Sequence, residues 1–303
     1  MPVDLNRGTT GVLLPKAVSG DIWSAVLEQS QVMAASSTIP LPGAGLTIPM
    51  ITGEPVANWV AETDEKPVSR STVSSKSMQG YTIAVIEPFS NQFRRDLPGL
   101  YGELVRRLPA ALARKFDRTV YGVDTVPGSN FDSLGTAPTL PIIGASNAPP
   151  TLAQVLAVIT AVSAAGGDVT HWLMNGQAYA ALLGAVNPQQ GTQYFTAGQT
   201  PSGQLAPTIF GSPVLRTKTP FKSSTTVADD VGIAGDWAGS AFVGTVEGVS
   251  VDISNQATIN DGGTQLNLWQ RNMFAVKAEI EVGFLVRDVN HFVRLTETGA
   301  DTP

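Results

Sequence analysis

The chain has 303 residues and a mass of 31.7 kDa, enough to bury a sizeable core in one large or two modest domains. Charged residues make up only 15% of it, which indicates either a surface of glycine- and proline-rich loops, supported by 30 Gly and 21 Pro, or a surface covered by oligomerisation. The formal net charge of −6 argues against a protein whose whole surface grips DNA. Because there is no cysteine, disulfides and thiolate metal sites are excluded. No apolar run reaches the roughly 20 residues of a membrane span.

The amino-terminal part predicts an extended arm followed by short elements. Residues 1 to 18 are polar, contain glycine and show no periodicity, and they lack the apolar core of a secretory signal, so we expect a cytoplasmic protein. Ser19-Gly20-Asp21 precedes apolar residues at helical spacing, which predicts a short capped helix from Ile22. Residues 37–51 are strand-like but contain three prolines, which suits an edge strand or a ribbon.

A long polar excursion follows, between Trp59 and the apolar run at residues 81–86. It contains Lys66-Pro67 and a serine- and threonine-rich run that ends at Met78. Such a segment buries too little apolar area to hold itself against its own subunit. We therefore predict that it finds its partner on another chain.

Two helices are predicted in the middle of the chain. The first is capped by Asp96, has Pro98 in its first turn, and carries apolar residues on one face as far as Val120. Pro109 lies inside this pattern and is expected to kink or break the helix. The second covers residues 152–162 and stops at a glycine pair.

Short strands and one further helix are predicted in the second half. Residues 128–150 and 184–203 are interpreted as loops. Asn175 is expected to cap a short helix that follows a buried strand in the chain. The remaining strands are expected at residues 169–174, 209–215, 231–234, 241–253 and 266–295. Strands placed before and after helices without a βαβ rhythm indicate an α+β fold.

Patterns of enzymatic chemistry and of metal or cofactor binding are missing from the sequence. There is no glycine-rich phosphate loop and no Gly-x-Ser-x-Gly elbow. His171 and His291 are the only histidines and do not have metal-ligand spacing, and we expect His171 to be a hydrogen-bonded core residue. We predict no cofactor and no metal. The five tryptophans are interpreted as core or interface anchors.

Several sequence pieces, in this order, resemble the major capsid protein of tailed bacteriophages, which has the Hong Kong 97-type fold. They include Trp172-Leu173-Met174-Asn175, Phe210-Gly211-Ser212-Pro213-Val214 and Gly235-Asp236-Trp237, placed behind the excursion and the long helix. The resemblance implies an amino-terminal arm, an extended loop, a spine helix, a peripheral domain and an inserted axial domain. The expected ranges are 1–35 for the arm and short helix, 52–85 for the extended loop, 36–51, 86–134 and 237–303 for the peripheral domain with the spine helix, and 135–236 for the axial domain.

The resemblance implies a structural role rather than an enzymatic one. The chain would build pentamers and hexamers of an icosahedral capsid around double-stranded DNA, assembled in a bacterial cytoplasm and kept in the virion. Its partners would be other copies of itself, a portal, and in some phages decoration proteins. Because the arm starts close to Met1, we expect a separate scaffolding protein.

The resemblance also implies a crosslink, because some family members join subunits by an isopeptide bond. Lys66 falls at the position of the lysine, Asn272 at that of the asparagine, and Glu279 at that of the assisting glutamate. On a regular strand Asn272 and Glu279 would point to opposite faces. The alternative is that Lys66 is a solubilising charge, that Asn272 ends a turn, and that Glu279 pairs with Lys277 or Arg287 across strands.

A basic bias on the long helix is the second functional hint, because the family places this helix toward packaged DNA. A modest basic face can meet phosphates without reading sequence. The alternative is a solvated face paired with acids from neighbours. The candidates are Arg106, Arg107, Arg114, Lys115 and Arg118.

Three rival functions stay open at this point. An encapsulin, which is a bacterial nanocompartment shell of the same fold, would enclose protein cargo instead of DNA. An α+β enzyme with an unrecognised site would form monomers or small oligomers. A carbohydrate-binding or tail component is less compatible with the long helices.

Overall fold

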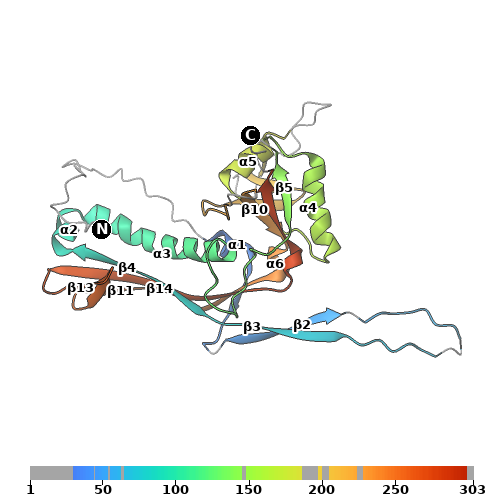
Figure 1. Cartoon of the computed structure of the whole chain (residues 1–303), viewed down its shortest axis with the longest axis horizontal. Coiled ribbons are helices and arrows are strands. Elements are labelled where there is room, and N and C mark those ends of the chain that lie inside the picture. Colours follow the sequence, from blue (N-terminus) through green and yellow to red (C-terminus); the bar gives the residue numbers. More distant parts are fainter. Residues whose placement is uncertain are drawn as a thin grey trace.

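The structure is a computed structural model, and two β-sheets and a long projecting hairpin form its framework (Figure 1). The predicted arm and the helix expected from Ile22 lie outside the described residues. In the part of the chain that the structure describes, no helix is long and apolar enough to cross a membrane. The described residues are 30–43, 45–53, 55–62, 65–144, 148–185, 197–199, 205–223 and 228–298.

Runs of consecutive strands are separated by single helices or pairs of helices along the chain. The helices are α1 (Gln31–Ala35), α2 (Asn91–Asp96), α3 (Pro98–Val120), α4 (Leu152–Ala164), α5 (Gly176–Leu183), α6 (Trp237–Ser240) and the 3₁₀-helix η2 (Val289–His291). The strands are β1 (Ser37–Pro40), β2 (Leu46–Gly53), β3 (Thr72–Met78), β4 (Tyr81–Ser90), β5 (Thr139–Ile143), β6 (His171–Met174), β7 (Ala197–Gln199), β8 (Leu205–Ile209), β9 (Ser212–Arg216), β10 (Asp230–Gly235), β11 (Ala241–Ser254), β12 (Thr258–Asp261), β13 (Thr264–Asn267), β14 (Met273–Val286) and β15 (Phe292–Glu297).

The first sheet is four-stranded, in the order β1-β11-β14-β4, and α3 lies along it (Figure 1). The α3 residues that face this sheet, among them Leu108 and Leu112, pack on Phe89, Phe274 and Val276. The helix runs unbroken through Pro109, so the expected break does not occur. One lost backbone hydrogen bond is outweighed because the leucines on either side stay buried against the sheet.

The start of α3 differs from the prediction in one residue. Pro98 does occupy the first turn, but the N-cap is Leu97, which makes no side-chain cap hydrogen bond. Asp96 instead ends the preceding helix α2, and its carboxylate accepts a hydrogen bond from Arg95 Nε at 3.0 Å. The predicted cap is wrong because the chain makes a separate turn of helix before α3 begins.

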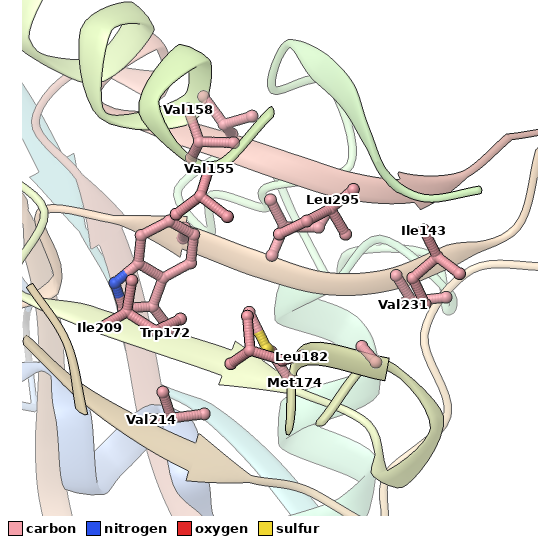
Figure 2. Close-up of a cluster of buried hydrophobic side chains, with 14 of the residues drawn as sticks. Ile143, Val155, Val158, Trp172, Met174, Leu182, Ile209, Val214, Val231 and Leu295 are labelled. Carbon is pink, nitrogen blue, oxygen red and sulfur yellow. The ribbon is translucent and has the colours of Figure 1, made fainter. Parts of the chain in front are cut away.

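The second sheet is seven-stranded, in the order β5-β15-β10-β6-β9-β8-β7, and it is covered by α4 and α5. Trp172 of β6 is fully buried at the centre, against Val155 and Val158 of α4 (Figure 2). Thr151 and Gln154 form a capping box at the start of α4. Asn175 caps α5 as predicted, because its Oδ1 accepts from Ala178 N at 2.8 Å.

Three segments differ from the strand predictions. Residues 128–150, expected as loop, contain β5, which pairs in parallel with β15. Residues 184–203, also expected as loop, contain β7, which pairs with β8. The expected long strand at 266–295 is divided into β13, β14 and β15, and β15 lies in the seven-stranded sheet. The α+β fold is confirmed. The predicted domain boundaries remain predictions, with residues 292–297 paired to strands of the predicted axial range.

Candidate assembly site

The loop between β2 and β3 is the most exposed part of the described chain. All described residues from 55 to 71 are exposed, and the hairpin carries them far from both sheets (Figure 1). Trp59 is 105% exposed and Val68 84% exposed, so large apolar side chains project into solvent. Across the loop, Val56 N donates to Ser69 Oγ at 2.8 Å. An exposed apolar set of this kind is typical of a contact surface for another chain.

The base of the hairpin, in contrast, is firmly attached. Met78 is buried against Leu41, which directly follows β1, and against Leu285 of β14. On the same strand, Lys76 Nζ donates to the Val286 carbonyl oxygen at 2.7 Å and lies 3.3 Å from Asp132 Oδ2. The loop is therefore held out from a fixed root. Sequence reasoning missed this anchor, because Lys76, Asp132 and Val286 are far apart in the chain.

The three predicted crosslink residues lie in different parts of the subunit. Lys66 is exposed in the loop. Asn272 is exposed in the turn before β14 with a φ of 54°, and its Oδ1 accepts from Asn91 Nδ2 at 2.9 Å. Glu279 lies within β14. The backbone at Asn272 is therefore a turn rather than a regular strand.

These residues do not meet within one subunit. Seven positions of extended chain separate Asn272 from Glu279, which is about 20 Å. Asn272 lies next to α2, because its carbonyl oxygen accepts from Asn91 N. The loop that holds Lys66 lies at the opposite end of the molecule from α2 (Figure 1). Any bond between these groups would have to join different copies of the chain.

Glu279 already has a partner, as the alternative interpretation predicts. Lys277 Nζ donates to Glu279 Oε1 at 3.0 Å and lies 3.3 Å from Asp252 Oδ2. Its bond to Glu279, and then that to Asp252, raises the pKa of Lys277. Glu279 also lies 3.5 Å from Ser250 Oγ. To act as a base, Glu279 would first have to leave Lys277.

Two of the candidate DNA-facing cations are paired with an acid of their own chain. Arg118 makes two hydrogen bonds to Asp124, of 2.8 and 3.0 Å, and Lys115 makes a third of 2.9 Å. The alternative interpretation expected acids from neighbours to pair with this helix. The acid that does so, Asp124, belongs to the same chain and lies just beyond the end of α3. Arg107 and Arg114 are exposed on the helix. The structure describes the backbone of Arg106 but not its side chain.

The pairing at Asp124 predicts an acid-sensitive contribution to stability. The hydrogen bond from Arg118, helped by Lys115, lowers the pKa of Asp124 to about 2 from 3.8. The stabilisation is therefore complete above the unfolded value and is lost as pH falls through about 2. We expect Asp124→Asn to reduce the free energy of unfolding by about 1–2 kcal/mol at neutral pH.

Urea denaturation of the two chains between pH 7 and pH 2 checks this prediction. The gap between wild type and Asp124→Asn should stay constant down to about pH 4 and close toward pH 2. A gap that does not change over this range would show that the carboxylate charge is not what stabilises the end of α3.

The tryptophans divide into two groups that the sequence does not distinguish. Trp172 and Trp237 are fully buried, whereas Trp59 and Trp269 are exposed. Trp23 lies outside the described residues. His171, expected in the core, is half-buried, with its Nδ1 3.3 Å from Thr170 Oγ1, and burial lowers the pKa of its imidazole.

Comparison with known proteins agrees with this arrangement. The family model described as "Phage capsid family" matches residues 10–296. The probable major capsid protein of Mycobacterium phage L5 is 30% identical over 96% of this chain and 90% of its own length.

Solved structures show the same fold. A chain of Gordonia phage Cozz superposes with a TM-score of 0.75 at 22% identity, covering 95% of this chain and 92% of that one. A chain of Mycobacterium phage Adephagia gives a TM-score of 0.77 at 18% identity, covering 99% and 100%. These relatives do not favour the encapsulin alternative. With its exposed hairpin loop, two sheets and long helix α3, the chain belongs to the phage capsid family.

Proposed function

We propose that this chain is the shell-building subunit of an icosahedral phage head, forming pentamers and hexamers around double-stranded DNA. The observation that carries the proposal is the loop at residues 55–71, which is exposed along its described length and presents Trp59 to solvent. Belonging to the phage capsid family makes the chain a structural component of the virion rather than an enzyme in the usual sense.

The loop suits a lattice in which each subunit both covers a neighbour and is covered by one. Its root is fixed by Lys76 and Met78, so its direction is set before any partner arrives. A preorganised contact loses less conformational entropy on binding. Repeating one modest contact around a closed ring and across rings gives a durable shell from weak pairs.

The domain roles follow from the predicted division. The elements at 36–51, 86–134 and 237–303 would form the peripheral domain, and those at 135–236 the axial domain near the centre of each capsomer. Within the last peripheral range β15 would be the exception and join the axial sheet, because it pairs with β5 and β10. A separate scaffolding protein, a portal and decoration proteins remain proposed partners, with assembly in the host cytoplasm.

Contact with packaged DNA would be non-specific and weak. Asp124 already offsets part of the charge of Lys115 and Arg118. Arg107 and Arg114 are exposed on the same helix, and Arg106 belongs to the same predicted set. Phosphate contacts of this kind add affinity without sequence readout.

Electron microscopy of the purified chain and of its particles tests the proposed function. We expect curved shells containing pentamers and hexamers, with nuclease-protected double-stranded DNA in particles from infected cells. Shells that hold a protein cargo would support the nanocompartment alternative. Monomers or small oligomers under all assembly conditions would contradict the proposal.

A covalent link between subunits is a second, finer proposal. The Lys66 amine of one copy would attack the side-chain carbonyl carbon of Asn272 in another, forming a C–N bond and releasing ammonia. The hydrogen bond from Asn91 to the Asn272 carbonyl oxygen would stabilise the negative charge that develops there. Glu279 would accept the proton of the amine, and since it lies far from Asn272 along β14 it would come from a different copy than that asparagine.

Denaturing electrophoresis of mature particles checks the crosslink. We expect ladders of multimers in wild type that disappear in Lys66→Ala and in Asn272→Asp, a change that removes the amide leaving group and still tolerates a positive φ. Lys218→Ala, at an exposed lysine outside the loop, serves as the matched control and should keep the ladders. A single band at 31.7 kDa in wild-type particles would contradict the crosslink.

A further inference from the structure

The hairpin of β2 and β3 leaves the four-stranded sheet at one edge and returns to it at the other. The chain enters the hairpin from β1 and leaves it into β4, which are the two edge strands in the order β1-β11-β14-β4. The hairpin is a two-stranded sheet of its own, and within the described residues no ladder joins it to the larger sheet. Its root crosses the face of the two central strands, where Met78 lies against both β11 and β14.

The crossing point is a hollow with two glycines at its floor. Gly244 of β11 and Gly283 of β14 are direct partners in the ladder, and both are buried. Residues two positions apart on a strand point to the same face, so Phe242 and Leu285 stand beside the glycines and border the hollow. Met78 of β3 fills it and is buried there.

Gly283 lies against the main chain of the hairpin root. A Cβ atom at this position would lie 2.7 Å from the Gln79 carbonyl oxygen and 2.9 Å from Met78 Cγ. Ordinary van der Waals contact begins at 3.4 Å, so the backbone at Gln79 would have to retreat by about 0.7 Å to make room. The missing side chain at Gly283 is therefore what permits this close approach of two backbones.

Gly244 meets a different part of the root. A Cβ atom here would lie 2.8 Å from Met78 Cε, 3.1 Å from Met78 Sδ and 3.1 Å from Leu41 Cδ2. These atoms are near the ends of flexible side chains, which can change rotamer without moving the backbone. Neither glycine has a positive φ, so alanine suits the local backbone at both positions. The two neighbours thus differ in whether an added methyl group would meet backbone or side chain.

A second contact between β3 and β14 lies two residues earlier on β3. Lys76 Nζ donates to the Val286 carbonyl oxygen at 2.7 Å. Asp132 Oδ2 accepts from Val286 N at 2.9 Å and lies 3.3 Å from the same ammonium group. Strand β3 therefore rests on β14 at two places about 7 Å apart, and two points of support fix the direction of a strand.

We propose that Gly283 is the positioning residue of the hairpin: its bare backbone supports the root and sets the direction in which the loop at residues 55–71 is held out. The direction is a property of the subunit, and only its consequence for shells rests on the proposed function. A methyl group at Gly283 would lift one point of support and turn β3 about the other. A lift of about 0.7 Å over about 7 Å tilts the strand by about 6°, which displaces Ser71 by about 2 Å.

Pulsed electron paramagnetic resonance measures this displacement on the purified full chain. The chain has no cysteine, so two introduced cysteines carry the only nitroxide labels. One label is placed at Ser71→Cys, and the other at Ala84→Cys on β4 or at Ala157→Cys on α4, all of which are exposed positions. Two reference positions are used because a rotation can leave a single distance unchanged. An excess of unlabelled chain restricts the signal to pairs within one chain.

The unsubstituted root gives the first result. We expect a single distance for each label pair, with a distribution no wider than the labels themselves produce. A broad distribution would show that the hairpin has no fixed direction and would overturn the proposal. This measurement needs no change at Gly283, so it stands even where a substituted chain does not fold.

Gly283→Ala and Gly244→Ala give the second result. We expect Gly283→Ala to move the mean distance of at least one label pair by about 2 Å, and Gly244→Ala, the matched control in the same hollow, to keep both distances. Unchanged distances in Gly283→Ala, or an equal displacement in Gly244→Ala, would overturn the assignment to Gly283.

Sedimentation velocity of the same variants separates this inference from the proposed function. We expect Gly283→Ala to assemble fewer shells than wild type and Gly244→Ala to assemble as wild type does. Normal shells from a chain with a displaced loop would contradict the assembly role of the loop, whereas the label distances alone decide whether Gly283 positions the hairpin.

Discussion

Replacing Trp59 by alanine is expected to abolish shell assembly while leaving the isolated subunit as stable as wild type. The side chain is 105% exposed, so its removal should change the free energy of unfolding by no more than about 0.5 kcal/mol. A buried aromatic anchor at an interface is worth about 2 kcal/mol or more, and each subunit would lose one such contact. Sedimentation velocity measures assembly, and urea denaturation measures subunit stability.

Trp59→Phe is the matched variant for this experiment. It keeps an aromatic side chain on the loop and should retain most of the assembly. Normal shells from Trp59→Ala would show that the exposed loop is not an assembly contact. A large loss of subunit stability would show instead that Trp59 packs on its own chain.

Arg294→Met is expected to produce the largest loss of stability among the polar substitutions considered. Arg294 Nη1 lies 3.0 Å from Asp230 Oδ2, and Nε donates to the Ala137 carbonyl oxygen at 3.1 Å. The two charged side chains are only 15% and 6% exposed, and they join β15 to β10. Removing the cation leaves a buried carboxylate without its partner, which costs about 3–5 kcal/mol.

The pH dependence of this variant gives a second reading. Burial raises the pKa of Asp230, and Arg294 opposes that rise. Without Arg294 the carboxyl should take up a proton more readily, so the destabilisation should shrink as pH falls toward the raised value. The double variant Arg294→Met with Asp230→Leu should recover much of the loss. A loss under 1 kcal/mol at pH 7, or no recovery, would contradict this account.

Local signals account for the parts of the fold that the sequence predicts well. Helices α3 and α5 begin where Pro98 and Asn175 predict, because these effects act within one turn. Strand β5 was missed because its proline-containing segment gains its stability from parallel pairing with β15, more than 150 residues away, and no local pattern records that pairing.

The candidate site was predictable only in part. The polar composition and the length of the segment after Trp59 predict a loop that packs little on its own subunit. The described residues of this loop are exposed, in agreement with that expectation. The Lys76 anchor and the Asp124 pairing depend on side chains that the fold brings together. The sequence also gives no means of telling the exposed Trp59 from the buried Trp172.

A map of the assembled shell by electron cryomicroscopy tests the central claim most directly. If the loop at residues 55–71 gains its stability from adjacent copies, the Trp59 indole will be buried against a neighbouring subunit in every ring. A loop folded onto its own subunit, or a Trp59 side chain still facing solvent in the closed shell, would contradict the account.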